Sequence, residues 1–292
     1  MTGQHILFLG YGFVARALAR RLHGKGWRTS ATFRRLEQAN MLAADGVAAV
    51  HWRNDLLEAR AADDAGALLV STPPDDAGCP ALRATQRTFA AMTPRWIGYL
   101  STNGVYGDHD GAVVDETSPL LATSPRALNR IAAERAWSAF AREHGHHLVI
   151  FRLPGIYGPG RSAFDQIREG RAQRIYKQGQ VFSRMHVDDI AAAIDAGLGA
   201  PSAGALFNLA DDEPAPPQDV IEYACRLIGI EPPPLVPIEE AALSDMARSF
   251  YADNKRVSNA LMKRALGLGL LYPTYREGLA AILAAERAGE AR

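Results

Sequence analysis

The hydrophobic pattern of the first half of the chain alternates between two kinds of segment. Short apolar runs predict buried strands, and longer stretches with an apolar residue every three or four positions predict helices. In the first such stretch, Val14, Leu18 and Leu22 form one apolar stripe that can pack against a sheet. This alternation is typical of an α/β fold with a doubly wound parallel sheet. We predict strands at residues 5–10, 28–32, 47–52, 67–72, 96–102 and 147–153.

Two further helices are predicted before the pattern changes after Gly158. Helices are predicted at residues 81–92 and 126–144, where Gly145 is typical of the residue that follows a helix end. After Gly158 the alternation becomes irregular, and Pro-rich breaks indicate a smaller second part. The breaks lie at residues 214–217 and 232–234, and further helices are expected near 217–229, 256–266 and 274–288.

Composition and charge exclude several classes of partner. The 292 residues include 32 basic and 32 acidic side chains, so no net charge attracts nucleic acid or an anionic membrane. Cys79 and Cys225 are too few and too far apart for a disulfide framework or a zinc motif, which fits a reducing cytoplasm. The apolar run at residues 6–10 is far too short to span a bilayer. We therefore expect a cytoplasmic protein with no nucleic-acid or membrane partner.

The first predicted strand ends in a glycine turn that leads into the first helix. Gly10, Gly12 and Ala15 have the G-x-G-x-x-A spacing. The glycines permit a tight turn and close approach of the backbone to a pyrophosphate, and the helix start supplies N–H groups. Because the strand, turn and helix context is met, we predict dinucleotide binding here, with Phe13 and Val14 beside the cofactor. The alternative is an ordinary strand-to-helix turn.

The residues after the second strand favour NADP over NAD. An NAD-binding chain is expected to place a carboxylate there for the ribose 2′-hydroxyl, but this chain has Arg34 and Arg35. Guanidiniums suit a 2′-phosphate, although a solvated pair on a loop is the alternative. Asp55 follows the third strand and could reach the adenine, unless it belongs to a plain surface turn. Thr72, at the end of the strand at 67–72, completes the predicted cofactor-binding set.

Four further segments resemble the extended short-chain dehydrogenase/reductase family, the NAD(P)-dependent epimerases and dehydratases. They are YLSTNGVYGD (99–108), FRLPGIYGPGR (151–161), MHVDDIAAAI (185–194) and FNLADDEP (207–214). The resemblance covers nearly the whole chain. It implies a Rossmann domain for the cofactor, a smaller substrate-selecting domain and a homodimer. We expect the Rossmann domain at residues 1–160 with 181–212 returning to it, and the smaller domain at 161–180 and 213–292.

The resemblance also implies an active site, from which this chain departs. The family uses a Ser or Thr after the fifth strand and a Tyr-x-x-x-Lys helix, whose tyrosinate is the general acid/base. Thr102 matches the hydroxyl position. Counted back from the family-like Ala133 and Glu134, the tyrosine position falls on Arg126 and the lysine position on Arg130.

The two arginines change the expected chemistry. Arginine stays protonated and cannot accept a proton, and a positioned acid/base is typically worth about 10²–10⁴-fold in rate. Hydride transfer should therefore be slow unless another group supplies the proton. Arg130 can still bind ribose hydroxyls, and Arg126 could clamp a carboxylate or phosphate. The alternative is that both arginines are surface residues whose stems cover the helix.

Other side chains could contribute to this site. Tyr106 and Tyr157 follow sheet strands and are candidate acids, although a packed structural role is favoured for both. By resemblance, Pro154 and Ile156 would run beside the nicotinamide. Arg161 is a candidate anion-binding residue, with a solvated loop arginine as the alternative.

Two clusters carry less weight as sites. Asp188 and Asp189 are adjacent at a predicted helix start, where helix capping is the favoured role. The HGHH segment at 144–147 spans a helix end, a turn and a strand start, so its imidazoles diverge and we expect no metal site. No G-x-S-x-G elbow and no G-x-x-x-x-G-K-[ST] loop is present, which argues against an α/β-hydrolase and a P-loop enzyme.

Two functions remain open at this point. The first is an NADP-dependent oxidoreductase or epimerase-like enzyme that acts on a small or nucleotide-linked, anionic substrate. The second is a non-catalytic dinucleotide-binding sensor or interaction protein, which the missing tyrosine favours.

Overall fold

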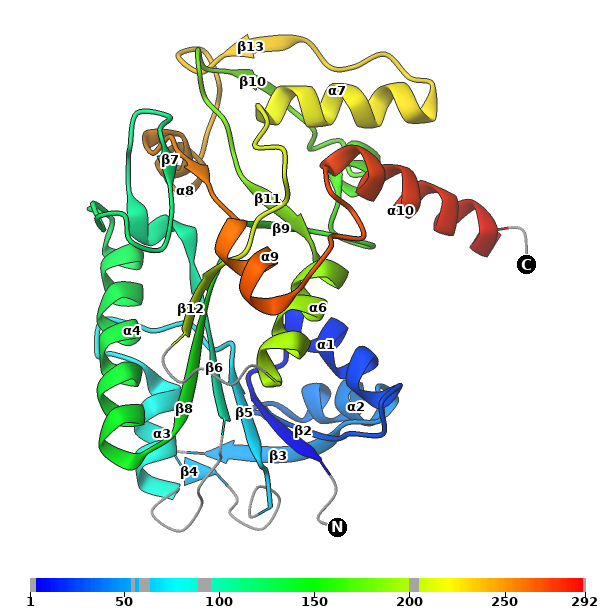
Figure 1. The fold of residues 1–292 in the computed structure, drawn as a ribbon. Coiled ribbons are helices and arrows are strands. Elements are labelled where there is room, and N and C mark those ends of the chain that lie inside the picture. The colour runs from blue at the N-terminus through cyan, green and yellow to red at the C-terminus, as the bar shows by residue number, and fades with distance from the viewer. Residues whose placement is uncertain (1–3, 54–55, 58–63, 89–95, 200–204, 291–292) are drawn as a thin grey trace. The chain divides into compact units, whose positions relative to one another are not determined.

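The computed structural model describes residues 4–53, 56–57, 64–88, 96–199 and 205–290 (Figure 1). The chain has the predicted α/β fold and divides into two compact units. The first unit comprises residues 1–105, 123–152 and 190–207, and the second comprises residues 106–122, 153–189 and 208–292. No helix within the described part of the chain is both long and apolar enough to cross a membrane.

An eight-stranded sheet forms the centre of the first unit. Its strands are β1 (His5–Leu9), β2 (Arg28–Phe33), β3 (Ala48–Arg53), β4 (Leu56–Leu57), β5 (Ala67–Val70), β6 (Trp96–Thr102), β8 (His147–Leu153) and β12 (Ala205–Asn208). Their order is β12-β8-β6-β5-β1-β2-β3-β4. β1 pairs in parallel with β2 and β5, and β4 is antiparallel to β3. The chain runs outward from β1 in one direction and returns to β5 on its other side, so the switch point of the sheet lies between β1 and β5.

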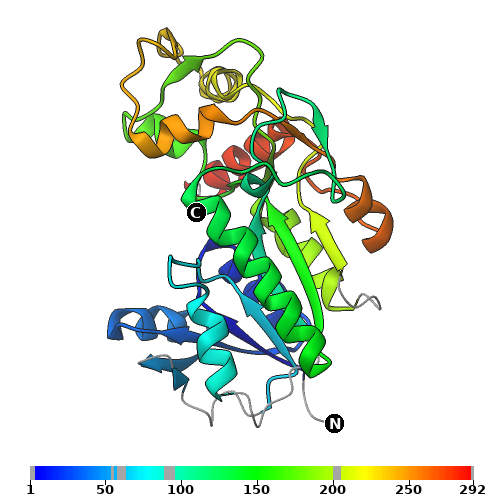
Figure 2. The same ribbon diagram turned by 90° about the vertical axis from the view of Figure 1, so that its left-hand side faces the viewer.

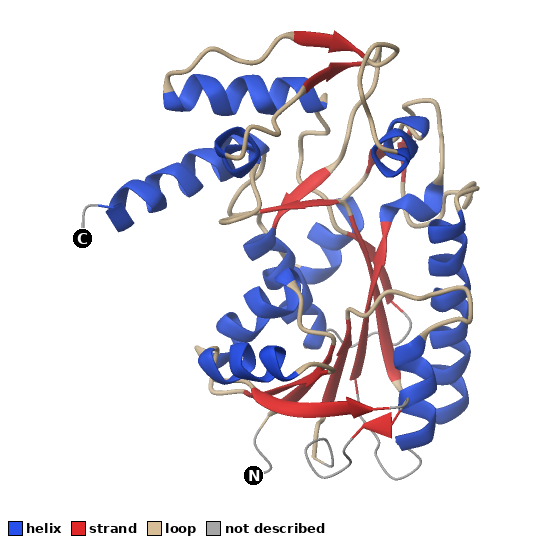
Figure 3. Cartoon of the chain, turned by 180° about the vertical axis from the view of Figure 1, so that it is seen from behind, coloured by secondary structure: helices blue, strands red, loops and turns tan. Residues whose placement is uncertain are grey.

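Helices cover both faces of this sheet. They are α1 (Phe13–His23), α2 (Leu36–Ala44), α3 (Pro80–Thr88), α4 (Pro125–His144) and α6 (Val187–Leu198), the last of which begins in the second unit. Figures 1 and 3 show α3 and α4 on one face and α1, α2 and the main part of α6 on the other. Figure 2 looks onto the face that α3 and α4 cover. The predicted stripe of Val14, Leu18 and Leu22 is buried, which confirms the sheet-facing side of α1.

The second unit consists of short elements around its own core. They are β7 (Val113–Val114), β9 (Gly155–Tyr157), α5 (Ala163–Arg168), β10 (Arg174–Tyr176), β11 (Arg184–His186), α7 (Pro217–Ile228), β13 (Leu235–Pro237), α8 (Asp245–Ala252), β14 (Arg256–Val257), α9 (Ala260–Leu266) and α10 (Tyr275–Glu290). β9 pairs with β11, β10 with β13 and β7 with β14, all in parallel. Phe164, Cys225 and Tyr275 are buried in this core.

The pairing of β7 with β14 explains two differences from the sequence-based expectations. The backbone N–H of Arg256 donates to Ala112 O (2.9 Å), and that of Ser258 donates to Val114 O (2.8 Å). Residues 256 and 257 are therefore a strand, and the helix predicted from residue 256 begins at Ala260. The same bonds tie residues 106–122 to the second unit, whereas the sequence analysis placed them in the Rossmann domain. Helices α2, α5 and α8 were not predicted.

Candidate functional site

The glycine turn after β1 requires glycine at one position and leaves space at another. Gly10 has φ +93°, and a Cβ there would lie 2.8 Å from Ser71 Oγ and 3.2 Å from the Thr72 backbone nitrogen. A side chain at Gly12 would meet nothing within 4 Å. Helix α1 begins at Phe13 with no side-chain cap and no acidic residue in its first turn. The open backbone at Gly12 and the positive helix end therefore fit the pyrophosphate of a dinucleotide.

Hydroxyl groups fix the shape of this turn. The Gly10 N–H donates to Thr32 Oγ1 (2.9 Å) at the end of β2. The Ser71 hydroxyl donates to Gly10 O (2.9 Å), and the Thr72 hydroxyl donates to Leu9 O (2.8 Å). Because Ser71 and Thr72 follow β5, these bonds join the carboxyl ends of three neighbouring strands at the switch point. These hydrogen bonds therefore fix the backbone conformation of the turn.

The predicted phosphate-binding arginines also lie at this edge of the sheet. Arg34 and Arg35 follow β2 and are exposed. Their backbone N–H groups both donate to Gln38 Oε1, at 3.0 and 3.1 Å. Asp55, the predicted adenine contact, lies outside the described residues.

Thr102 ends β6 and is half-buried. Its Oγ1 accepts a hydrogen bond from the Gly104 N–H (3.1 Å). A hydroxyl that accepts one hydrogen bond still has its own proton to donate. Thr102 therefore retains the donor that polarisation of a carbonyl requires.

Helix α4 presents its two arginines in different ways. Ser124 caps the helix through its side chain and Pro125 occupies the first turn. Arg130 Nη1 donates to Leu100 O (2.6 Å) and to the Tyr99 hydroxyl (3.4 Å), so its guanidinium holds the end of β6. Burial raises the pKa of Tyr99 to about 12, while the Arg130 charge opposes that rise. The Arg126 side chain is exposed.

A buried ion pair lies one turn further along α4. Arg152 donates to both carboxylate oxygens of Glu134, at 3.1 and 2.7 Å, and the Ser101 hydroxyl donates to Glu134 Oε1 at 2.5 Å. All three side chains are buried. The network joins β6, α4 and β8 directly beside Thr102 and Arg130. This network was not predicted, although Glu134 in an otherwise apolar helix stripe and Arg152 within an apolar strand were visible signals in the sequence.

The candidate tyrosines of the second unit are engaged in its packing. Tyr106 is fully buried, and its hydroxyl donates to Asn208 Oδ1 (2.7 Å). Tyr157 donates to Thr274 O (3.3 Å), and a Cβ at Gly278 would lie 2.1 Å from its hydroxyl oxygen. Burial raises the pKa of Tyr157 far above the ordinary phenol value. This geometry fits the packed structural role that the sequence analysis favoured for both phenols.

The remaining predicted contacts of the second unit lie around β9. Pro154 is buried and Ile156 is half-buried, and Ile156 pairs with Met185 of β11. Arg161 is exposed in the loop before α5.

Asp189 differs from its expected capping role. Its carboxylate is buried and accepts the backbone N–H groups of Leu271 (2.8 Å) and Tyr272 (2.9 Å). It therefore anchors a distant loop of the second unit. Asp188 is exposed at the start of α6.

One buried carboxyl of the second unit has an unusual pKa. Asp211 is 2% exposed, and burial raises its pKa to about 8, although the Arg184 charge opposes the rise. One oxygen of Asp211 and one terminal nitrogen of Arg184 lack a hydrogen-bond partner among the described residues. Neither residue was predicted as a site residue.

The histidine cluster lies apart from the glycine turn. His144 and His146 pack around Phe140, at 4.6 and 5.3 Å between ring centroids. Within the described ranges, no three His, Cys, Asp or Glu side chains are grouped so that they could hold a metal ion.

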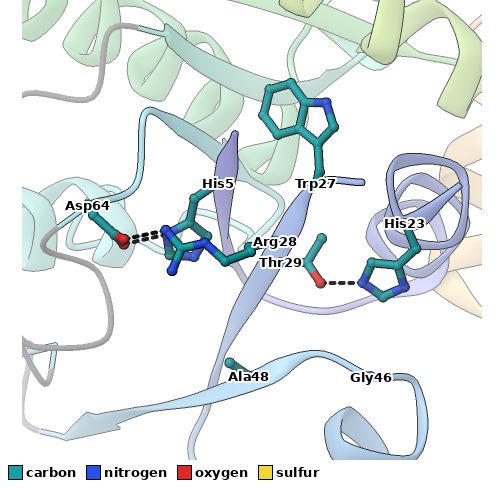
Figure 4. Close-up of a pocket in the computed structure, with 8 residues that line it drawn as sticks. All are labelled: His5, His23, Trp27, Arg28, Thr29, Gly46, Ala48 and Asp64. Atoms are coloured by element: carbon teal, nitrogen blue, oxygen red, sulfur yellow. Dashed lines mark hydrogen bonds and ion pairs between the residues drawn. The ribbon is translucent and has the colours of Figure 1, made fainter. Parts of the chain in front are cut away.

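A cavity of about 570 Å³ lies at the beginnings of β1, β2 and β3. Figure 4 shows eight residues that line it. Asp64 contacts His5 (2.7 Å) and Arg28 in its wall, and His23 contacts Thr29 (2.6 Å). Ligands of open α/β sheets bind at the opposite, carboxyl ends of the strands.

Comparison with known proteins agrees with this geometry. Residues 80–210 match the NAD dependent epimerase/dehydratase family. Protein YeeZ of Escherichia coli (strain K12) is 28% identical over 277 residues, which are 88% of this chain and 94% of that protein. The structure of a functionally unknown conserved protein from Silicibacter pomeroyi DSS is 47% identical with a TM-score of 0.90, and the match covers 97% of this chain and 99% of that one.

A more distant structure shares the fold. It is dTDP-glucose 4,6-dehydratase from Bacillus anthracis str. Ames in complex with NAD, with 16% identity, a TM-score of 0.77 and coverage of 99% of this chain and 98% of that one. Residues 80–210 of this chain therefore resemble the NAD dependent epimerase/dehydratase family, and the chain as a whole shares the fold of the dTDP-glucose 4,6-dehydratase.

Proposed function

We propose that this chain is an NADP-binding, epimerase/dehydratase-like oxidoreductase that acts on a small or nucleotide-linked, anionic substrate. The observation that carries this proposal is the glycine turn at the switch point of the sheet, which is rigidly held at Gly10 and open at Gly12. The cofactor, when bound, supplies hydride transfer at its nicotinamide ring.

The chain's own residues then have distinct roles. Gly12, Phe13 and Val14 bind the pyrophosphate through the start of α1. Arg34 and Arg35 supply the positive charge that attracts the 2′-phosphate, which is the feature that favours NADP. Pro154 and Ile156 flank the nicotinamide, as the family resemblance implies.

The substrate side rests on groups that donate hydrogen bonds. The Thr102 hydroxyl polarises the substrate carbonyl, and the exposed Arg126 binds its anionic group. Arg161, in the second unit, is a further proposed anion-binding residue. Arg130 is already committed to Leu100 and Tyr99, so we assign it the positioning of the β6 end beside Thr102.

Proton transfer is the weak step of the proposed reaction. Arginine at the tyrosine position cannot exchange a proton, and the phenols of Tyr106 and Tyr157 are buried and hydrogen-bonded elsewhere. The native protein is therefore expected to turn over slowly. Under this proposal, the double variant Arg126→Tyr with Arg130→Lys gains about 10²-fold in reductase rate, the lower range for one positioned acid/base.

The experiment is an absorbance assay of NADPH consumption with a panel of keto sugars, keto acids and nucleotide-linked sugars. Slow consumption by the native protein that rises in the double variant supports the proposal. If NADPH binds but neither protein consumes it with any substrate, the non-catalytic sensor or interaction protein replaces the enzyme. We also propose a cytoplasmic homodimer, for which light scattering of the purified protein tests the dimer.

A further inference from the structure

Arg34 and Arg35 are adjacent in the chain, but the structure holds them differently. The guanidinium carbon of Arg34 lies over the ring of Trp52, 4.5 Å from its centroid. Trp52 is in β3 and is 5% exposed, so its ring is a fixed surface within the core. Arg35 immediately precedes α2 and its side chain is exposed.

Stacking on an indole restricts a guanidinium without consuming its hydrogen-bond donors. The cation is attracted to the face of the ring, and the N–H groups around the edge of the guanidinium remain directed outward in its plane. A flexible arginine loses rotamer freedom when it binds a ligand, whereas a stacked one has already lost part of it. Arg34 is therefore the better organised of the two cations.

The backbone around Arg34 is tied to the glycine turn. Thr32, two residues earlier, accepts the Gly10 N–H (2.9 Å), and Gln38 Oε1 accepts the Arg34 N–H (3.0 Å). The stacked guanidinium thus has a defined position relative to the turn and to the start of α2. A guanidinium at a fixed position can recognise one phosphate group, which a diffuse positive charge does less well.

We propose that Trp52 positions Arg34 to bind the 2′-phosphate of NADP, and that Arg35 contributes only general positive charge. This inference rests on the proposed use of NADP. Trp52 does not itself contact the phosphate in this account, and it acts through the orientation of Arg34.

The test compares the dissociation constants of NADPH and NADH by calorimetry in four variants. Trp52→Leu removes the aromatic face and is expected to weaken NADPH binding about fivefold, the worth of one cation–π contact, without changing NADH binding. Trp52→Phe keeps an aromatic face and should retain most of the NADPH affinity. Arg34→Lys keeps the charge but loses the planar fork, so it should also weaken NADPH binding. Arg35→Lys is the matched control: it also keeps the charge, and it should leave NADPH binding nearly unchanged.

The outcomes separate this inference from the proposed function. If the native protein binds neither nucleotide, the proposed function is overturned. If it prefers NADH, the proposed use of NADP and this inference are both overturned. If it prefers NADPH and Trp52→Leu keeps that preference, the role of Trp52 alone is overturned. Because Trp52 packs in the core, thermal unfolding is measured in parallel. Should the Leu variant fail to fold, an Arg34→Lys variant with undiminished NADPH preference overturns the inference instead.

Discussion

The carboxyl edge of the sheet and the core of the second unit both contain hydroxyl-bearing side chains, which the two regions use differently. At the sheet edge, Thr72 and Thr102 are half-buried, and their hydroxyls shape backbone turns beside the open Gly12. In the second unit, Tyr106 and Tyr157 are buried and bond to neighbouring segments. A motif residue at the end of a strand therefore does not by itself mark a ligand contact, and burial decides which of the two roles the side chain has.

The largest expected effect concerns the network beneath the sheet edge. Glu134→Ala leaves the Arg152 guanidinium buried without its main partner, which typically costs about 3–5 kcal/mol in the free energy of unfolding. Denaturant unfolding measures the change. Glu37→Ala, in the exposed first turn of α2, is the control and should stay within about 0.5 kcal/mol of the native protein. Equal stability of the two variants would show that the network does not support the edge.

The second prediction concerns the buried Asp211 of the second unit and the pH dependence of the free energy of unfolding. Asp211 has a pKa of about 8 in the folded protein and about 3.9 when unfolded. Between these values the folded state holds one proton more, so this group makes stability fall by up to about 1.4 kcal/mol per pH unit as pH rises. Asp211→Asn should flatten the profile across that window and be more stable than the native protein above pH 8. A native profile that rises from pH 5 to pH 8 with the same slope in both proteins would contradict the assignment.

The third prediction separates the two glycines of the turn. Gly10→Ala forces a side chain onto a positive φ and against Ser71 Oγ, at an expected cost of about 1–3 kcal/mol in unfolding free energy. Gly12→Ala meets no protein atom and should leave the unfolding temperature nearly unchanged. Thermal unfolding of the two variants gives the comparison directly, and equal destabilisation would mean that Gly12 also has a structural role.

The last prediction concerns the phenol of Tyr106, where the expected effect is no larger than that at Gly10. Tyr106→Phe removes the hydrogen bond to Asn208 and leaves that buried amide short of a partner, which costs about 1–3 kcal/mol. If the role is structural, the reductase rate per folded molecule should remain that of the native protein. A large loss of rate with unchanged stability would instead make Tyr106 the missing acid.

Local patterns were sufficient for the sheet and the glycine turn. The six predicted strands and the Val14, Leu18 and Leu22 stripe depend on periodicity within a few residues, and all are confirmed. The G-x-G-x-x-A spacing likewise belongs to one strand, turn and helix, and the structure forms that turn.

Long-range pairings could not be predicted in the same way. Glu134 pairs with Arg152 of β8, and Asp189 accepts hydrogen bonds from a loop more than eighty residues away. Arg256 of β14 pairs with Val113 of β7. No periodicity in the sequence encodes these partners, because they depend on how the segments pack. The contact of Arg34 with Trp52 is another long-range pairing of this kind. Arg34 and Arg35 therefore could not be distinguished from the sequence.

The most direct test of the central claim is calorimetric titration of NADPH and NADH into the native protein and into Gly12→Ala. The account predicts that the native protein binds NADPH more tightly than NADH, and that Gly12→Ala loses at least about tenfold in affinity for both, because a methyl group occupies the space through which the pyrophosphate approaches the backbone. Absence of nucleotide binding to the native protein, or equal affinity in the variant, would contradict the claim that the open glycine turn is the cofactor site.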